Sequence, residues 1–226
     1  MKRVTGLPRV IVYNAVSADG RFDWFTPDIG QFYKLVPTWR EDVTLVGSNT
    51  LLGAKASELP DDEEAFEPPK PDPRDKRPLL VVVDSRGRVR KWDALRKAGY
   101  WRSVAAICSR TTPKEYRDYL KRRHIDCIVA GKDHVRPRVA LEKLRARYSA
   151  RTVRIDSGGT LNGVFLRAGL VTEVNLLVHP QLVGGTTPKS MYRAEDLTSA
   201  KGVIDLKLIR VRKIRNRLVW LRYKVL

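Results

Sequence analysis

The feature that most constrains the fold is a regular alternation of short β-rich runs with segments of helical spacing. Strands are predicted at 9–14, 43–47, 79–84, 103–108, 126–130, 152–156 and 172–179. Helices are predicted at 29–39, 92–98, 113–123, 139–148 and 161–168, and Pro37 is expected to end or kink the first of them. Strands alternating with helices indicate a largely parallel sheet covered on both faces, in a three-layer α/β/α arrangement.

The C-terminal part departs from this alternation. Two β-rich runs at 203–212 and 217–225 flank a polar turn, which predicts an antiparallel hairpin at the edge of a mixed, mostly parallel sheet. We find no repeat, low-complexity tract or linker, so residues 1–226 are predicted to form one domain. Residues 57–78 are rich in proline and acid and predict a long surface loop, either functional or a tolerated insertion.

The formal net charge of +19 favours anionic partners. The basic residues are spread from Arg3 to Lys224 rather than gathered in one tract, so we expect a phosphate-bearing small molecule and not nucleic acid as the main partner. No apolar run is long enough to cross a membrane, and the N-terminus has no apolar signal region. A cytoplasmic protein with two reduced thiols, Cys108 and Cys127, and no metal site is expected.

Polar and glycine residues gather where the predicted strands end. In open α/β sheets ligands bind beyond the carboxyl ends of the strands. Ser157–Thr160 joins a strand to a helix, where a glycine pair lets a phosphate approach backbone N–H groups, although a tight packing turn would use the same glycines. Ser85-Arg86-Gly87-Arg88 suggests a clamp for a ribose 2′-phosphate, with a basic surface turn as the alternative.

The order of these motifs resembles the reductase domain of bacterial riboflavin biosynthesis, the C-terminal half of the bifunctional deaminase-reductase (RibD-type), which has the dihydrofolate-reductase-like fold. The resemblance covers nearly the whole chain, and 156–185 is its most specific part. It is carried by five segments: Asn14 with Ser17-Ala18-Asp19-Gly20, Leu45-Val46-Gly47 with Thr50, Val82-Val83-Asp84-Ser85-Arg86, Gly158-Gly159-Thr160-Leu161-Asn162-Gly163, and Pro180-Gln181-Leu182-Val183-Gly184-Gly185.

This resemblance implies an NADPH-dependent oxidoreductase that transfers hydride to a C=N or ribosyl carbon of a pyrimidine- or pterin-type substrate. Asp156 would orient the heterocycle or ribose as a catalytic residue, and Asp19 or a bound water would manage the proton. Asn14, Ser17 and Asp156 would face the substrate. The implied cofactor-binding residues are Val46, Gly47, Thr50, Ser85, Arg86, Gly131, Gly158, Gly159, Thr160 and Leu161. A homodimer formed through the 203–225 hairpin is also implied.

The departures from the family pattern lie on the substrate side. The family usually carries a carboxylate four and five residues after the threonine, where this chain has Ala54 and Lys55, and its Glu-Gly-Gly is replaced by Asp156-Ser157-Gly158-Gly159. The ribosylamino-pyrimidine phosphate of riboflavin biosynthesis, dihydrofolate, another pterin and an unknown imine therefore stay open as substrates. A basic nucleic-acid-associated protein and a nucleotide-binding protein without turnover are the non-enzymatic alternatives.

Overall fold

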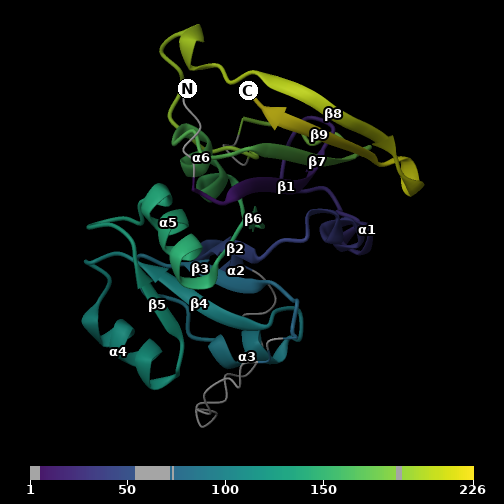
Figure 1. Ribbon diagram of the computed structural model, residues 1–226. Coiled ribbons are helices and arrows are strands. Elements are labelled where there is room, and N and C mark those ends of the chain that lie inside the picture. Colours follow the sequence, from purple (N-terminus) through teal and green to yellow (C-terminus); the bar gives the residue numbers. More distant parts are fainter. Residues whose placement is uncertain (1–5, 54–71, 73, 187–189) are drawn as a thin grey trace. The chain divides into compact units, whose positions relative to one another are not determined.

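The structure, a computed structural model, describes residues 6–53, 72, 74–186 and 190–226. They divide into two compact units (Figure 1). Unit 1 comprises Met1–Pro8 and Glu41–Val153, and unit 2 comprises Arg9–Arg40 and Arg154–Leu226. The prediction that 1–226 is one domain stays a prediction.

Unit 1 is built on a parallel sheet. Its strands are β2 (Val43–Gly47), β3 (Leu79–Val83), β4 (Ser103–Cys108) and β5 (Asp126–Val129), in the order β5-β4-β3-β2. All three pairings are parallel, with Val46 opposite Val82 and Val82 opposite Ala106. β2, β3 and β4 are almost continuously buried and apolar, as expected for strands covered on both faces.

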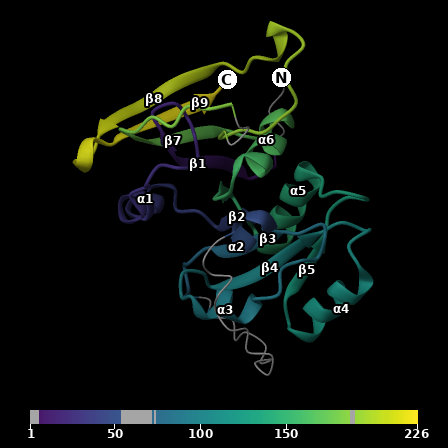
Figure 2. The same ribbon diagram turned by 180° about the vertical axis from the view of Figure 1, so that it is seen from behind.

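Helices cover both faces of this sheet (Figures 1 and 2). They are α2 (Ser48–Gly53), α3 (Trp92–Lys97), α4 (Lys114–Arg122) and α5 (Pro137–Tyr148). On one face, Trp92 and Leu95 of α3 and Leu120 of α4 join a core with Leu80 and Val82. On the other face α5 buries Ala140, Leu141 and Leu144. The predicted α/β/α layering is therefore present in unit 1.

Unit 2 contains the mixed part of the fold. β1 (Arg9–Ser17) pairs in parallel with β7 (Glu173–His179), and β7 pairs antiparallel with β9 (Val219–Val225). β8 (Leu206–Lys213) pairs antiparallel with β9 and ends the sheet order β1-β7-β9-β8. The prediction of a mostly parallel sheet with an antiparallel C-terminal hairpin is confirmed. The boundary between the units falls within β6 (Thr152–Ile155).

The two faces of β1 pack against different helices, because side chains alternate along a strand. Ile11 and Tyr13 form a core with Phe32 and Leu35 of α1 (Ile29–Leu35). The Asn14 side chain instead contacts Asn162 of α6 (Gly159–Arg167). The remaining described elements are the short 3-10 helices η1 (Val36–Trp39), η3 (Ala200–Gly202) and η4 (Arg215–Arg217).

Several predicted boundaries shift. β1 runs on to Ser17, past the predicted end at residue 14, because its polar residues Asn14 and Ser17 are buried. α6 begins at Gly159, so its first turn contains residues that were predicted to form the preceding loop. The helix that starts at Ile29 changes to 3-10 geometry next to Pro37, as expected.

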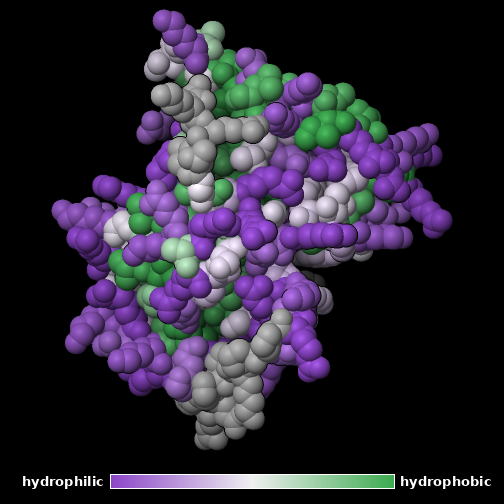
Figure 3. Space-filling view, in the orientation of Figure 1, coloured by the Kyte–Doolittle hydropathy of each residue, from purple (hydrophilic) through white to green (hydrophobic). Residues whose placement is uncertain are grey.

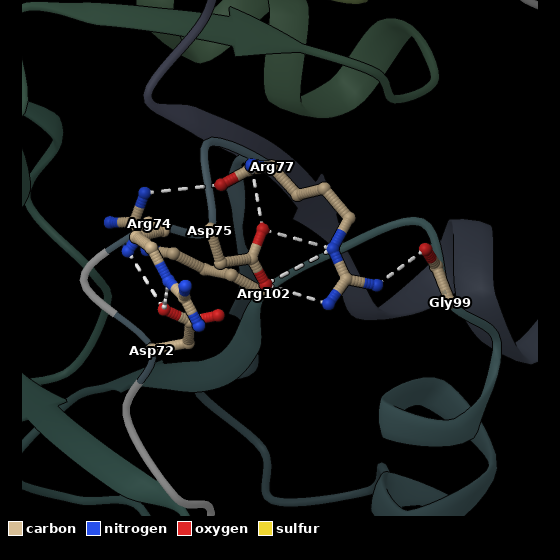
Figure 4. Close-up of polar contacts among 6 residues, drawn as sticks. All are labelled: Asp72, Arg74, Asp75, Arg77, Gly99 and Arg102. Atoms are coloured by element: carbon tan, nitrogen blue, oxygen red, sulfur yellow. Dashed lines mark hydrogen bonds and ion pairs between the residues drawn. The ribbon is translucent and has the colours of Figure 1, made fainter.

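The predicted loop at 57–78 lies mostly outside the described residues; only 72 and 74–78 are described. Its end is anchored by side chains (Figure 4). Arg77 donates to Asp75 Oδ2 at 2.6 Å and to the Gly99 carbonyl at 2.7 Å. Arg102 donates to the Arg77 carbonyl at 3.2 Å. The chain that enters β3 is therefore fixed to the segment that precedes β4.

The face of the molecule in Figure 3 is mainly hydrophilic, with hydrophobic side chains among the hydrophilic ones over the β8–β9 hairpin. Within the part of the chain that the structure describes, no helix is both long and apolar enough to span a bilayer.

Candidate functional site

The loop that follows β3 is held by a buried carboxylate. Asp84 is fully buried, and its Oδ2 accepts hydrogen bonds from the backbone N–H groups of Arg88 (2.6 Å) and Val89 (2.8 Å). Gly87, with φ of +66°, makes the turn, and a Cβ there would lie 2.7 Å from the Tyr116 ring. The loop that carries Ser85 and Arg86 therefore has a fixed backbone.

The two arginines of this loop differ. Arg88 donates to the Ser48 and Asn49 side chains of α2, at 3.1 and 2.5 Å, so it ties the loop to the end of β2. Arg86 is exposed and makes no hydrogen bond or ion pair with any described residue. Arg86 is thus left with five N–H donors for an anion, as a 2′-phosphate clamp requires. Arg88, which the sequence did not separate from Arg86, has a structural role.

The other predicted cofactor residues of unit 1 have mixed surroundings. Val46 is buried in the core, so only its backbone could face a ligand. Gly47 ends β2, and Thr50 is exposed on α2. Ser85 Oγ accepts a hydrogen bond from the backbone N–H of Val135 at 3.3 Å. These residues occupy the strand ends at which we expected them.

Gly131 is explained by the fold itself. It has φ of +120°, and a Cβ there would lie 2.1 Å from the carbonyl oxygen of His134. An L side chain rarely adopts that backbone conformation. The glycine at this position is therefore required by the turn between Ala130 and Arg136, whether or not a cofactor lies beside it.

In unit 2, a buried amide pair joins β1 to α6. Asn14 Nδ2 donates to the Ser157 carbonyl at 3.0 Å, and Asn14 Oδ1 accepts from Asn162 Nδ2 at 2.8 Å. Asn162 is fully buried and also donates to the Met191 carbonyl at 3.0 Å. Both ends of the Asn14 side chain are thus engaged inside unit 2, and Asn14 shapes the segment around Ser157. The sequence did not reveal the role of Asn162, although a polar residue in an apolar helix is a signal.

The glycines that begin α6 serve two different purposes. A Cβ on Gly159 would lie 2.3 Å from the Ser190 carbonyl oxygen, and a Cβ on Gly163 would lie 2.0 Å from that of Arg193. Both glycines therefore allow residues 190–193 to cross the helix closely. Gly158 is different: it has an ordinary φ of −79°, and a Cβ there meets no described heavy atom within 4 Å. No steric contact in the described structure explains why residue 158 is glycine.

The remaining predicted residues at the start of α6 are at least partly accessible to solvent. Thr160 is exposed and Leu161 is half-buried. The N-cap residue Gly158 has no side chain that could cap this helix, and the first backbone N–H groups of a helix are those that an anion binds.

Asp19 is bound to the segment that follows β7. Its Oδ1 accepts from Ser17 Oγ at 2.5 Å and from the Val183 N–H at 3.2 Å, and its Oδ2 accepts from the Gly184 N–H at 2.6 Å. The hydrogen bond from Ser17 is the largest cause that lowers the pKa of Asp19 to about 2. Asp19 is therefore ionised at neutral pH and holds the 183–184 turn in place.

Asp156, directly after β6, is the exposed end of an ion pair. Arg154 Nη1 lies 2.9 Å from Asp156 Oδ2, and the side chain of Arg154 is 3% exposed against 24% for Asp156. The pKa of the neighbouring Tyr13 is raised, mainly by burial. The charge of Arg154 acts to lower this pKa, and the charge of Asp156 acts to raise it. The sequence pointed to Asp156 but not to Arg154.

Among the described residues, no group of three or more histidine, cysteine or acidic side chains is placed to hold a metal ion. What the two units offer instead is hydrogen-bond donors for phosphate and a carboxylate with a free edge. In unit 1 the donors belong to Arg86. In unit 2 they are the backbone N–H groups of the first turn of α6, which begins at Gly159, three residues after Asp156.

Comparison with protein families gives one match that spans most of the chain. The model of the RibD C-terminal domain matches residues 8–220. A curated relative from Methanothermobacter thermautotrophicus, named 2,5-diamino-6-ribosylamino-4(3H)-pyrimidinone 5′-phosphate reductase, is 28% identical over 215 residues. That alignment covers 90% of this chain and 92% of the relative.

This chain aligns with only one part of some longer relatives. The riboflavin biosynthesis protein RibD of Escherichia coli is 26% identical over 206 residues, which cover 81% of this chain and 52% of that protein. The solved structure of Acinetobacter baumannii RibD superposes with a TM-score of 0.73 at 21% identity. It covers 98% of this chain, which spans 59% of that structure. At this identity the structural match supports the fold alone.

Proposed function

Because the chain belongs to the RibD C-terminal domain family, as its sequence indicated, we propose that it is an NADPH-dependent reductase of riboflavin biosynthesis. The curated relatives support an oxidoreductase. The proposed substrates are the ribosylamino-pyrimidine phosphates of that pathway, 2,5-diamino-6-ribosylamino-4(3H)-pyrimidinone 5′-phosphate first and 5-amino-6-(5-phosphoribosylamino)uracil second. A dihydropterin is the alternative substrate.

The observation that carries this proposal is the near full-length match to the archaeal reductase. The alignment covers 92% of that relative, so the relative has little chain outside the part that this protein shares. The match therefore favours the reductase reaction rather than a reaction that needs a further domain. The net charge of +19 is compatible with a substrate and a cofactor that both carry phosphate.

Two features of the residues fit NADPH. Arg86 is exposed without a partner among the described residues, so its guanidinium is free for a 2′-phosphate. Gly158 leaves open the space that a Cβ would fill at the N-terminus of α6, where a pyrophosphate would accept backbone hydrogen bonds. NADPH, when bound, supplies the hydride, whereas the protein supplies position and electrostatics. Gly47, Thr50, Ser85, Thr160 and Leu161 are the further residues proposed to line it.

On the substrate side we propose that Asp156 accepts a hydrogen bond from the ribose or the heterocycle. Its Oδ1 has no hydrogen bond to any described residue, and the side chain is partly exposed. Asn14 and Ser17 would support this side from within. The carboxylate of Asp19 accepts three hydrogen bonds and has a pKa lowered to about 2, so it is ionised at neutral pH, and its role in moving the proton stays a prediction. We propose that Asp19 positions the 183–184 turn.

A homodimer formed through the 206–225 hairpin is the proposed assembly. β8 is the last strand of the unit 2 sheet, and four of its apolar residues are between 42% and 55% exposed: Leu206, Leu208, Ile209 and Val211. An apolar sheet edge of this kind is a surface on which strands pair. Light scattering should give twice the chain mass for the wild type and the chain mass for Leu208→Asp. A monomeric wild type would refute the dimer. The proposed location is the cytoplasm, and no nucleic-acid partner is proposed.

The experiment that tests the function combines binding with turnover. Thermal melts with NADPH and NADH compare the cofactors, since a ligand that binds only the folded state raises the melting temperature. Oxidation of NADPH is then followed with each pyrimidine phosphate and with dihydrofolate. Stabilisation by NADPH and turnover of a pyrimidine phosphate are expected. Turnover of dihydrofolate alone would replace the proposed substrate, and no stabilisation by either cofactor would refute the reductase.

A matched pair of variants tests the clamp. Arg86→Ala should weaken NADPH binding by about 10-fold or more and leave NADH binding unchanged, because a charge-assisted hydrogen bond contributes about 1.5–3 kcal/mol. Arg138→Ala is the control, since Arg138 is also exposed in unit 1 and also has no partner among the described residues. An Arg86→Ala variant with the same preference for NADPH over NADH as the control would exclude Arg86 from the 2′-phosphate site.

A further inference from the structure

The ion pair of Arg154 and Asp156 is unusual because its two members differ in exposure. Arg154 is buried at 3% exposure, and its Nη1 lies 2.9 Å from Asp156 Oδ2, whereas Asp156 is 24% exposed. The two residues are two positions apart, so their side chains leave the strand direction on the same face. A buried guanidinium has lost most of its hydration, so its charge is compensated by partners within the protein, and the carboxylate of Asp156 is one of them.

The carboxylate does not depend on the arginine in the same way. Asp156 reaches solvent and could keep its charge hydrated without a partner. The ion pair therefore balances the charge of the carboxylate and also favours one orientation of it: Oδ2 lies 2.9 Å from Arg154 Nη1, and Oδ1 carries no hydrogen bond to any described residue. A carboxylate with one oxygen fixed and the other open is a preorganised acceptor for a single donor.

The wall beside the pair is also fixed. The Tyr13 ring stacks on Phe32 with centroids 4.2 Å apart, and its hydroxyl donates to the Phe32 carbonyl at 3.1 Å. Burial raises the pKa of Tyr13, so this neighbour stays neutral at physiological pH. Its single hydroxyl proton is already donated to Phe32, so it does not compete for the open oxygen of Asp156, and it adds no second charge.

From this geometry we infer that Arg154 is a positioning residue, which holds Asp156 as a charged acceptor for one neutral hydroxyl or N–H group of the substrate. The inference rests on the proposed function, because it takes Asp156 as a substrate-facing residue. It also defines the class of group that is recognised. The charge of Asp156 is already balanced by Arg154, so a neutral donor suits the open oxygen better than a cationic group does.

The test is a double-mutant cycle on turnover of the pyrimidine phosphate. Arg154→Met keeps an unbranched apolar side chain in place of the arginine stem and removes the guanidinium, and Asp156→Asn removes the charged acceptor. Each single change should lower kcat about 10- to 100-fold, as loss of orientation does, with NADPH binding unchanged. The double variant should be no slower than the slower single variant, because residues that act as a unit are not additive.

Two further variants separate positioning from a merely structural role. Arg154→Lys keeps a positive charge and should restore part of the kcat that Arg154→Met loses. Arg151→Met is the control, since Arg151 is exposed three residues away and should retain the wild-type kcat. Multiplicative losses in the double variant would overturn the inference. So would an unchanged kcat in Arg154→Met beside a lowered melting temperature.

Failure of the proposed function gives a different pattern. If the wild type reduces none of the compounds, the same four proteins of the cycle are unfolded in urea. A coupling between the two substitutions there would retain Arg154 as the partner of Asp156 and reject only the substrate, whereas additive stabilities would reject the pair itself.

Discussion

Gly163→Ala is expected to destabilise the protein, although alanine favours a helix. The added Cβ would lie 2.0 Å from the carbonyl oxygen of Arg193 and 2.6 Å from its carbonyl carbon. These are backbone atoms, so no side-chain rotation relieves the clash. Overpacking costs about 1–3 kcal/mol, and the helix propensity of alanine returns about 1 kcal/mol.

Relief of the clash would cost further contacts. If residues 190–193 move away from α6, the hydrogen bond from the Arg193 N–H to the Gly159 carbonyl (2.9 Å) and that from Asn162 Nδ2 to the Met191 carbonyl (3.0 Å) are lost. Each contributes about 1 kcal/mol. We therefore expect a net loss of about 2 kcal/mol, which lowers the melting temperature of a domain this size by about 4–8 °C.

The matched control is Gly158→Ser on the same helix. A Cβ at Gly158 meets no described heavy atom within 4 Å, and its extended φ and ψ suit a serine cap, so stability should hold or rise by a few tenths of a kcal/mol. Urea unfolding of both variants is the assay. A Gly163→Ala protein as stable as the wild type would refute the close crossing of 190–193. If the Gly158→Ser protein binds NADPH with the affinity of the wild type, the proposal that the pyrophosphate of NADPH binds at the N-terminus of α6 is refuted.

Three further changes test the loops around the candidate site. Asp84→Ala should cost about 2 kcal/mol or more in urea unfolding, because two backbone N–H groups lose their acceptor; a neutral result would show that water replaces it. Gly131→Ala should cost about 1–3 kcal/mol because of its φ of +120° and its contact with the carbonyl of His134, and a stability gain would contradict this turn. Asp19 has a lowered pKa of about 2, so its contribution to stability is present above the unfolded pKa and is lost as the pH falls from about 4 to about 2. Asp19→Asn should flatten the pH dependence of stability in that window, measured by urea unfolding, and an unchanged slope would reject the hydrogen bonds of this carboxylate.

The sequence predicted the buried parallel strands best. β2 and β4 have the predicted bounds, 43–47 and 103–108, because strands covered on both faces are continuous apolar runs with clear ends. The end of β1 was missed because Asn14 and Ser17 are polar and yet buried. Their partners, Ser157 and Asn162, come from distant parts of the chain, and no local pattern reveals such a pairing.

The candidate site was predicted in its positions but not in its contacts. Strand ends and glycines indicated where ligands would bind, since those features are local in sequence. The distinction between Gly158, which has open space, and Gly159, which packs against Ser190, needs the coordinates of a segment some thirty residues away. Arg154 was not predicted as a site residue. The chain is rich in arginine, so a single arginine inside a strand does not indicate a functional residue until its ion pair is known.

The division of the chain has a consequence for how the protein is made. Unit 2 is discontinuous, because residues 41–153 of unit 1 are inserted between its two parts. Ile11 of β1 pairs with Glu173 of β7, so a ribosome must add roughly 160 residues, in about 8–32 s at ~5–20 residues per second, before β7 exists to pair with β1. The apolar strand that starts unit 2 therefore waits for β7 while unit 1, nearly continuous in sequence, emerges and can fold first.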